Sequence, residues 1–389
     1  MKLASRMNNL GTETAFEVLV KARALEAQGR EIVHLEVGEP DFATPENIVN
    51  AAIDALHKGA TKYTPSAGLN ELREAIAKNV SVTRGVPVNP TQVVVTPGAK
   101  PIMFYVLLAL VDAGDEVLTP NPGFPIYESM IRFTGGIPKF YRLREENQFR
   151  FDPAEFLSLV SAKTKLIILN SPHNPTGGVL TESDLAVIAR VATERDIPVL
   201  ADEIYWRILY DGKHHSILQF PGMLERTILL DGFSKTYAMT GWRLGFGVMN
   251  ETLAPHITRL MTNSNSCTAA MIQWAGVEAL GGDQTAVAHM VEAFLGRRDA
   301  IVEGLNEIPG MRCQRPHGAF YVFPNVSQIG WSSRKLADYI LNEAGVACLS
   351  GTAFGEYGEG YLRFSYANSL ENIRKALERI RAAVLKIQD

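Results

Sequence analysis

Residues 226–250 read RTILLDGFSKTYAMTGWRLGFGVMN and contain two candidate strands with a polar loop between them. The first part, RTILL, is apolar and β-branched, which is typical of a buried strand. Lys235 follows this strand on a loop of small residues, and Arg243 stands eight positions later, where the second strand opens. A single loop lysine is most often just solvated. Any other role for Lys235 therefore depends on the rest of the chain.

The middle of the chain repeats the pattern of a buried strand followed by a polar loop. Helical stretches lie between several of these strands, among them PIMFYVLLALV (101–111) and TESDLAVIARVATERD (181–196), with Thr181 as a candidate N-cap. Continuous apolar strands that alternate with helices predict a mainly parallel sheet covered on both faces. The candidate strands are QVVVTPG (92–98), DEVLTPNPGFP (115–125), TKLIILN (164–170), IPVLADEIY (197–205), RTILLDG (226–232) and RLGFGVMN (243–250).

The two ends of the chain have a different character. Up to Thr44 there is one helical stretch and a short extended piece, and from His289 onward long amphipathic helices alternate with short strands. A chain of 389 residues also exceeds the length at which single cores usually split. We therefore expect a large α/β domain of residues 45–288 and a smaller α/β domain built from residues 1–44 and 289–389.

Composition excludes several classes of function. The formal net charge of −4 argues against a nucleic-acid binder. The longest apolar run, 101–111, is far shorter than the roughly 20 residues that span a bilayer. The N-terminus lacks the apolar segment of a signal peptide, and three scattered cysteines suit a reducing compartment. We expect a cytoplasmic protein without membrane or nucleic-acid partners.

Histidines and glycines give no sign of a metal or nucleotide site. The eight histidines form no HExxH pattern, and His214 and His215 lie in a polar turn, where we expect them to be solvated. The glycine-rich segment 351–360 matches no nucleotide-binding spacing. We expect no metal ion.

Polar residues follow the strands at the edge where open parallel sheets bind ligands. Each has an ordinary alternative: Asp202 can cap a helix, Asn174 can form a turn, Phe124 can be core, and Arg243 can pair with any carboxylate. Their joint placement at one edge is what favours a site. The set is Ala99, Lys100, Phe124, Asn174, Asp202, Tyr205, Ser234, Lys235 and Arg243.

These residue types suit pyridoxal 5'-phosphate. The amine of Lys235 can hold an aldehyde as a Schiff base, and Asp202 can keep a pyridine nitrogen protonated. Tyr205 and Asn174 can donate to a phenolic oxygen, and Phe124 can lie against a flat ring. The phosphate would take donors from the helix start at Ala99 and Lys100, from the hydroxyl of Ser234, and from the bidentate guanidinium of Arg243.

Six motifs resemble those of the class I/II pyridoxal-phosphate-dependent aminotransferases with the aspartate-aminotransferase fold, and the resemblance runs essentially end to end. They are SKTYAMTGWRLG (234–245), SPHNPTGG (171–178), ADEIY (201–205), YLRFSYA (361–367), VGEPDF (37–42) and KYTPSAGLNELREAI (62–76).

The resemblance implies a sheet of the seven-stranded type and a homodimer with shared active sites. It also implies that Arg363 grips the substrate α-carboxylate, with Gly38 beside it. Tyr63 would reach across the dimer interface to the partner's cofactor.

The implied reaction moves an amino group between an L-amino acid and a 2-oxo acid through a Lys235 Schiff base. Lys235, Asp202 and Tyr205 would be catalytic, and Gly38, Asn174 and Arg363 would bind substrate. Gly232 departs from members that carry a phosphate-binding serine three residues before the lysine. No residue is assigned to a distal acidic group, so the amino donor stays open.

Two alternatives remain at this point. A carbon–sulfur β-lyase would use the same cofactor and fold, since a fold does not determine a reaction. A ligand sensor fused to a DNA-binding domain would need a further segment, for which we find no residues.

Overall fold

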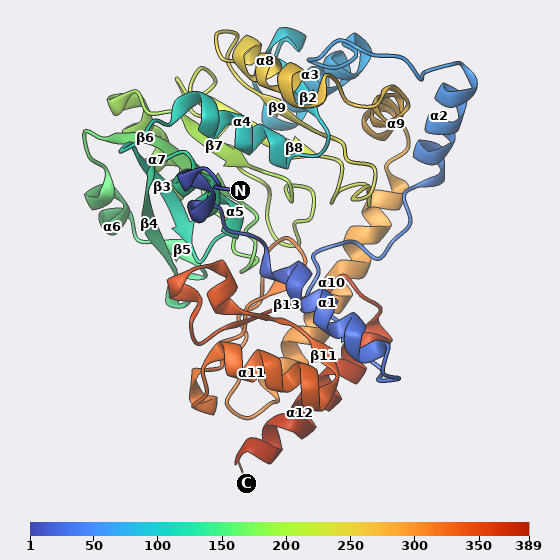
Figure 1. The fold of residues 1–389 in the computed structure, drawn as a ribbon, viewed down its shortest axis with the longest axis vertical. Coiled ribbons are helices and arrows are strands. Elements are labelled where there is room, and N and C mark those ends of the chain that lie inside the picture. The colour runs from blue at the N-terminus through green and yellow to red at the C-terminus, as the bar shows by residue number, and fades with distance from the viewer. Residues whose placement is uncertain (389) are drawn as a thin grey trace.

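A sheet of eight strands forms the centre of the computed structural model, which describes residues 1–388 (Figure 1). The strand order is β2-β9-β8-β7-β6-β3-β4-β5. In that order the strands are β2 (Val93–Thr96), β9 (Gly245–Val248), β8 (Thr227–Gly232), β7 (Val199–Asp202), β6 (Thr164–Asn170), β3 (Glu116–Asn121), β4 (Ile137–Arg144) and β5 (Arg150–Phe151).

The prediction of a mainly parallel sheet is confirmed, with two antiparallel exceptions. β9 runs antiparallel to both of its neighbours, and the two-residue strand β5 is antiparallel to β4. Because β9 is reversed, its amino end lies at the same edge as the carboxyl ends of β7 and β8. This reversal brings Arg243, just before β9, to the edge where Asp202 ends β7.

Side chains alternate between the two faces of the sheet, and helices cover both. Val94, Leu200 and Leu230 pack on one face against α4 (Lys100–Leu110), α5 (Pro125–Phe133) and α8 (Ala254–Asn265). The helices that cover the other face are α2 (Glu46–His57), α3 (Asn70–Arg84), α6 (Pro153–Leu159), α7 (Glu182–Arg195) and α9 (Ala270–Gly281). The expected cap of α7 is present, since the side chain of Thr181 accepts from the N–H of Asp184.

A second body of structure lies below the sheet in Figure 1 and uses both ends of the chain. Its strands form a three-stranded sheet of order β10-β13-β12 and a parallel pair, β1-β11. The elements are α1 (Thr14–Glu26), β1 (Val33–His34), α10 (Thr285–Asn306), β10 (Tyr321–Val322), α11 (Ser333–Tyr339), β11 (Val346–Ala347), β12 (Leu349–Ser350), β13 (Leu362–Ser365) and α12 (Leu370–Gln388).

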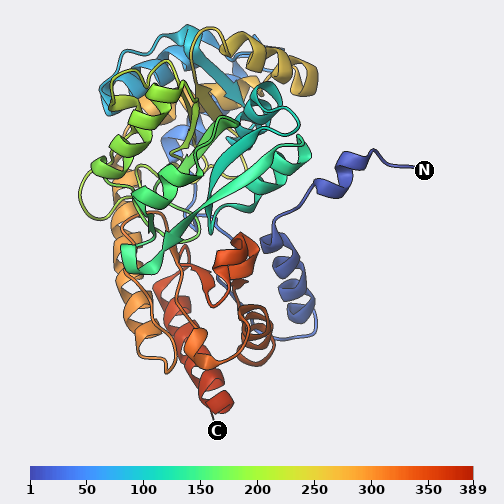
Figure 2. The same ribbon diagram turned by 90° about the vertical axis from the view of Figure 1, so that its left-hand side faces the viewer.

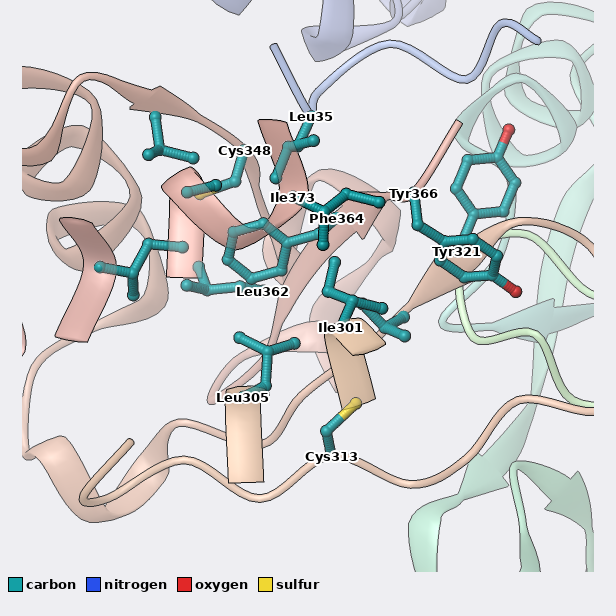
Figure 3. Close-up of a cluster of buried hydrophobic side chains, with 14 of the residues drawn as sticks. Leu35, Ile301, Leu305, Cys313, Tyr321, Cys348, Leu362, Phe364, Tyr366 and Ile373 are labelled. Carbon is teal, nitrogen blue, oxygen red and sulfur yellow. The ribbon is translucent and has the colours of Figure 1, made fainter. Parts of the chain in front are cut away.

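The lower body has its own hydrophobic core. Leu35 from the N-terminal end packs there with Ile301, Phe364 and Ile373 from the C-terminal end (Figure 3). The predicted boundary at 288/289 falls in the first turn of α10, a helix that runs without interruption between the two bodies (Figure 1). The division at these residue numbers stays a prediction.

The first residues of the chain form an arm at one side of the molecule (Figure 2), and this arm meets α5, where the N–H of Gly11 donates to Ser129 Oγ at 2.9 Å. A short helical turn, Ser5–Asn9, lies in this arm, and Leu3, Met7 and Leu10 are exposed. Within residues 1–388, no helix has the length and apolar character needed to cross a membrane.

Candidate active site

A cavity of about 520 Å³ opens at the edge of the sheet where β6, β7 and β8 end, within the range of small-molecule sites. It lies between the large sheet and the lower body, because Arg363 and Tyr321 line it from below. The structure brings eleven of the predicted site residues to its wall: Gly38, Ala99, Lys100, Phe124, Asn174, Asp202, Tyr205, Ser234, Lys235, Arg243 and Arg363.

Lys235 projects into this cavity from the loop after β8. Its Nζ donates to the carbonyl oxygen of Gly38 at 2.5 Å, so the lysine bridges the large sheet and the segment of Gly38. Burial lowers the pKa of Lys235 to about 8, with Glu39 opposing the shift. An amine with this pKa is in its neutral, nucleophilic form far more often at neutral pH than a solvated lysine.

Asp202 ends β7 and is almost fully buried. Tyr127 on α5 donates to its Oδ2 at 2.6 Å, and the N–H of Ile204 donates to its Oδ1 at 3.2 Å. Burial raises the pKa of Asp202 to about 6, although both hydrogen bonds oppose the shift. A cation placed next to this carboxylate would favour its ionised form. Asp202 can therefore hold a proton on a ring nitrogen.

One end of the cavity gathers cationic and N–H donors. Ala99 is the N-cap of α4 and Lys100 its first residue, so the positive end of the helix dipole faces the cavity. Arg243 has a φ of 55°, a left-handed conformation that costs about 1–3 kcal/mol in a non-glycine residue. A Cβ on Gly98 would lie 2.0 Å from Arg243 Nη2, and the φ of 88° at Gly98 also favours glycine, so the guanidinium occupies the space that this glycine leaves. This end can bind an anion.

The other end is built around Arg363 of β13. Its Nη1 donates to Asn174 Oδ1 at 3.2 Å, and its Nη2 donates to the carbonyl oxygen of Glu36. The guanidinium is buried, and its Nε has no hydrogen-bond partner among the described residues. A buried cation with spare donors is costly unless an anion completes it. The arrangement suits a carboxylate ligand.

Three side chains of the site were missed by the sequence analysis: Tyr127, Asn170 and Tyr321. Asn170 ends β6 and donates to the carbonyl oxygen of Asp202 at 3.1 Å. It could have been found, since it ends a predicted strand at the same edge. Tyr127 and Tyr321 lie inside apolar stretches that read as ordinary core, so no local signal separates them.

A buried ion cluster directly behind the site was also missed. Arg84, the last residue of α3, donates through Nε to Glu203 at 3.0 Å and through Nη2 to Asp231 at 3.2 Å. Its guanidinium also lies 3.9 Å from the ring centroid of Trp206. Burial raises the pKa of Asp231, whereas His214 and Arg84 outweigh burial and lower that of Glu203.

The prediction that His214 is solvated in a polar turn is wrong. Its Nε2 lies 3.0 Å from Glu203 Oε2, and only 9% of its side chain is exposed. The polar sequence around His214 hides this contact, because Glu203 comes from the loop after β7.

Tyr63 is the one predicted site residue that does not line the cavity. Its side chain is 88% exposed on this single chain. Its contact with a partner subunit stays a prediction.

Comparison with known proteins gives one family. The family model for aminotransferase class I and II matches residues 30–380. The aspartate aminotransferase of Bacillus subtilis is 37% identical, over 99% of this chain and 100% of its own length. The aromatic-amino-acid aminotransferase 2 of Thermococcus litoralis is 41% identical, over 91% of this chain and 92% of its own.

Solved structures agree with the sequence comparisons. The aspartate aminotransferase from Thermus thermophilus with maleate superposes with a TM-score of 0.95 at 38% identity, covering 98% of this chain and 100% of that one. The expected aspartate-aminotransferase fold is confirmed. These relatives carry aminotransferase names, and they give the lyase alternative no support.

Proposed function

Because the chain belongs to the class I and II aminotransferase family, we propose that it binds pyridoxal 5'-phosphate through Lys235 and uses it to transfer amino groups. Amino-group transfer between an amino acid and a 2-oxo acid is the activity of the family and of the named relatives. The family is generally dependent on pyridoxal phosphate. The cofactor's place in this chain and the roles of individual residues are the proposal.

One observation carries the proposal. A buried lysine with a pKa of about 8 and a buried carboxylate, Asp202, line the same cavity as Arg363 and a helix N-terminus. Each group matches one part of the cofactor or substrate. The lysine matches the aldehyde, Asp202 the ring nitrogen, Arg363 the substrate carboxylate, and the helix N-terminus the phosphate. When bound, the cofactor supplies an electron sink for the α-carbon of the substrate.

The residues of the chain then do the following work. Arg363 binds the substrate α-carboxylate, and Gly38 and Asn174 line the same place. Lys235 Nζ would take the proton from the substrate α-carbon as general base and then deliver it to C4′ of the cofactor as general acid. Asp202 holds the ring-nitrogen proton, and Tyr205 with Asn174 donates to the phenolic oxygen. Ala99, Lys100, Ser234 and Arg243 bind the phosphate, and Phe124 lies against the ring.

The test is Lys235→Ala, with the exposed Lys163→Ala as control. We expect the alanine variant at 235 to lose the visible absorbance of lysine-bound cofactor and nearly all transamination, whereas the control keeps both. Near-normal turnover of Lys235→Ala would reject the proposal. Release of pyruvate from an amino acid without any 2-oxo acid acceptor would favour the lyase instead.

The amino donor is the next question. The names of the relatives support acidic and aromatic amino acids as first candidates. A panel of amino acids, scored by the loss of the cofactor's absorbance band, would rank the donors.

We also propose a homodimer in the cytoplasm, with Tyr63 reaching the cofactor phosphate of the partner subunit. Two exposed features support a surface that binds a partner subunit. They are the side chain of Tyr63 and the apolar side chains Leu3, Met7 and Leu10 of the N-terminal arm. Cys267, Cys313 and Cys348 are all free thiols, which suits a reducing compartment.

The large sheet and the lower body each have a hydrophobic core, which supports a division of the chain into two domains. We propose that residues 45–288 and residues 1–44 with 289–389 form the two domains, because the lower core draws mostly on the second set. The cavity between them would then close when the smaller domain moves over the substrate.

A further inference from the structure

Two buried phenols meet inside the cavity. The hydroxyls of Tyr205 and Tyr321 are 2.7 Å apart, and their rings pack edge to face with centroids 5.7 Å apart. Both side chains are at least 95% buried, and both line the cavity. Among the described residues, each of the two hydroxyls has a hydrogen bond only to the other.

Tyr321 also contacts the substrate end of the site. The guanidinium carbon of Arg363 lies 4.6 Å from the ring centroid of Tyr321, which is cation–π distance. A Cβ on Gly38 would lie 2.0 Å from the hydroxyl oxygen of Tyr321, so this hydroxyl fills the space that the glycine leaves. Tyr321 therefore touches the carboxylate-binding arginine on one side and Tyr205 on the other.

We propose that Tyr321 is a positioning residue that couples the charge of Arg363 to the hydrogen bond that Tyr205 donates into the cavity. The proposal rests on the function proposed above, in which Tyr205 donates to the cofactor's phenolic oxygen. It adds Tyr321 to the site, and it gives a route by which a carboxylate bound at Arg363 raises the pKa of the proton at Lys235 Nζ.

The direction of the hydrogen bond follows from the role proposed for Tyr205. A phenol has one proton, and Tyr205 donates it into the cavity, so the 2.7 Å bond between the two hydroxyls runs from Tyr321 to the oxygen of Tyr205. Burial raises the pKa of both phenols, and the nearby charge of Arg363 opposes the rise at Tyr321. This charge favours the loss of the proton of Tyr321 and so strengthens Tyr321 as a donor.

A carboxylate bound to Arg363 would weaken this chain of donation. The carboxylate offsets the arginine's charge, so Tyr321 becomes a weaker donor and Tyr205 in turn donates less strongly. A weaker hydrogen bond stabilises the negative charge of a phenolate less, so the phenolate attracts the proton at Lys235 Nζ more strongly and that proton is held more tightly. Other titratable groups also act on this arrangement. Asp202 raises the pKa of Tyr205, and Glu36 and Cys348 oppose the fall in the pKa of Arg363.

The chain offers a matched control in Tyr366. It is buried in the same core and does not line the cavity. Its hydroxyl oxygen lies 3.2 Å from Tyr210 Oη and 3.1 Å from the carbonyl oxygen of Ala319, so its one proton has an acceptor outside the cavity. Figure 3 draws Tyr321 and Tyr366 at the same end of the cluster. Tyr366→Phe removes one buried hydroxyl, as Tyr321→Phe does, but breaks no bond to Tyr205.

The experiment is a pH titration of the visible absorbance of the holoenzyme, with and without maleate or 3-phenylpropionate as unreactive carboxylates. Without carboxylate, we expect the midpoint of Tyr321→Phe to lie about 0.1–0.6 pH unit above that of the wild type, because the bond that Tyr205 donates remains and loses only the strengthening by its neighbour, roughly 10–30%. The upward shift caused by the carboxylate should be smaller in Tyr321→Phe than in the wild type. Tyr366→Phe should titrate as the wild type does.

Tyr205→Phe breaks the same bond from its other side, and it serves as a second variant if Tyr321→Phe loses cofactor. In a Tyr205→Phe background, the Tyr321→Phe substitution should shift the midpoint no further. A wild-type midpoint and carboxylate shift in Tyr321→Phe, or an undiminished effect in the Tyr205→Phe background, would overturn the coupling. If the wild type shows no absorbance that depends on Lys235, the proposed function itself fails.

Discussion

At the residue scale, Asp202 and Lys235 show how burial prepares a site for chemistry. Burial moves the pKa of the carboxyl up to about 6 and that of the amine down to about 8, so both lie closer to neutrality than in water. Buried groups with shifts toward neutrality are typical of catalytic acids and bases. The identity of these two residues could be predicted from their places after β7 and β8.

We expect Asp202→Asn to separate cofactor binding from chemistry. Asparagine keeps the shape and can still accept from Tyr127, but it has no charge to hold a ring-nitrogen proton. Turnover should fall by at least about 100-fold, while much of the cofactor still binds. The control is Asp196→Asn, because Asp196 has an exposed side chain at the end of α7. Equal turnover in the two variants would mean that Asp202 only caps its loop.

At the element scale, Arg84 ties helix α3 to the ends of β7 and β8. Removal of the guanidinium leaves the carboxyl of Asp231 buried without its cation and leaves Glu203 with His214 as its remaining partner, and breaking a buried pair costs about 3–5 kcal/mol. We expect Arg84→Met to lower the melting temperature by several degrees more than Arg298→Met. Arg298 is also buried, but its partners Asp211 and Asp299 are partly exposed and can be solvated.

A compensated variant decides whether charge is the cause. Arg84→Met with Glu203→Gln and Asp231→Asn removes both carboxylates that Arg84 pairs, so neither is left buried without a cation and most of the lost melting temperature should return. If Arg84→Met melts no lower than Arg298→Met, the cluster contributes little to stability.

The helices and strands could be predicted from the sequence where the pattern of apolar residues is clear. The continuous apolar runs of β6, β7 and β8 predict buried parallel strands, and Thr181 predicts the start of α7. β4 was missed because its sequence, IPKFYRLR, mixes charged and apolar residues along an outer strand. The contacts of Arg84 and Tyr321 could not be predicted, because they join residues more than 100 positions apart.

At the scale of the whole molecule, the site needs both bodies of the structure. Lys235 and Asp202 come from the large sheet, whereas Gly38, Tyr321 and Arg363 come from the lower body. Prediction of this two-sided site from the sequence required that the N-terminal and C-terminal segments be assigned to the same site. The motifs VGEPDF and YLRFSYA allowed that assignment, because the family resemblance places both at the substrate carboxylate. A partner subunit would complete the site if Tyr63 acts across an interface.

Complementation tests the proposed sharing of sites. Subunits with Lys235→Ala are mixed with subunits with Tyr63→Phe, and mixed dimers are isolated by different affinity tags. If Tyr63 acts across the interface, each mixed dimer has one intact site, which should show wild-type cofactor affinity and turnover. If no site better than that of Tyr63→Phe alone appears in confirmed mixed dimers, the shared-site proposal is wrong.

The central claim, that Lys235 carries the cofactor, has a direct chemical test. Borohydride reduction of the purified holoenzyme fixes the cofactor on the amine that holds it, and peptide mass spectrometry then locates the modified lysine. Our account predicts the reduced cofactor on Lys235, and no such modification in Lys235→Ala. Modification of Lys100 in its place, or an unmodified Lys235 peptide from fully active enzyme, would contradict the account.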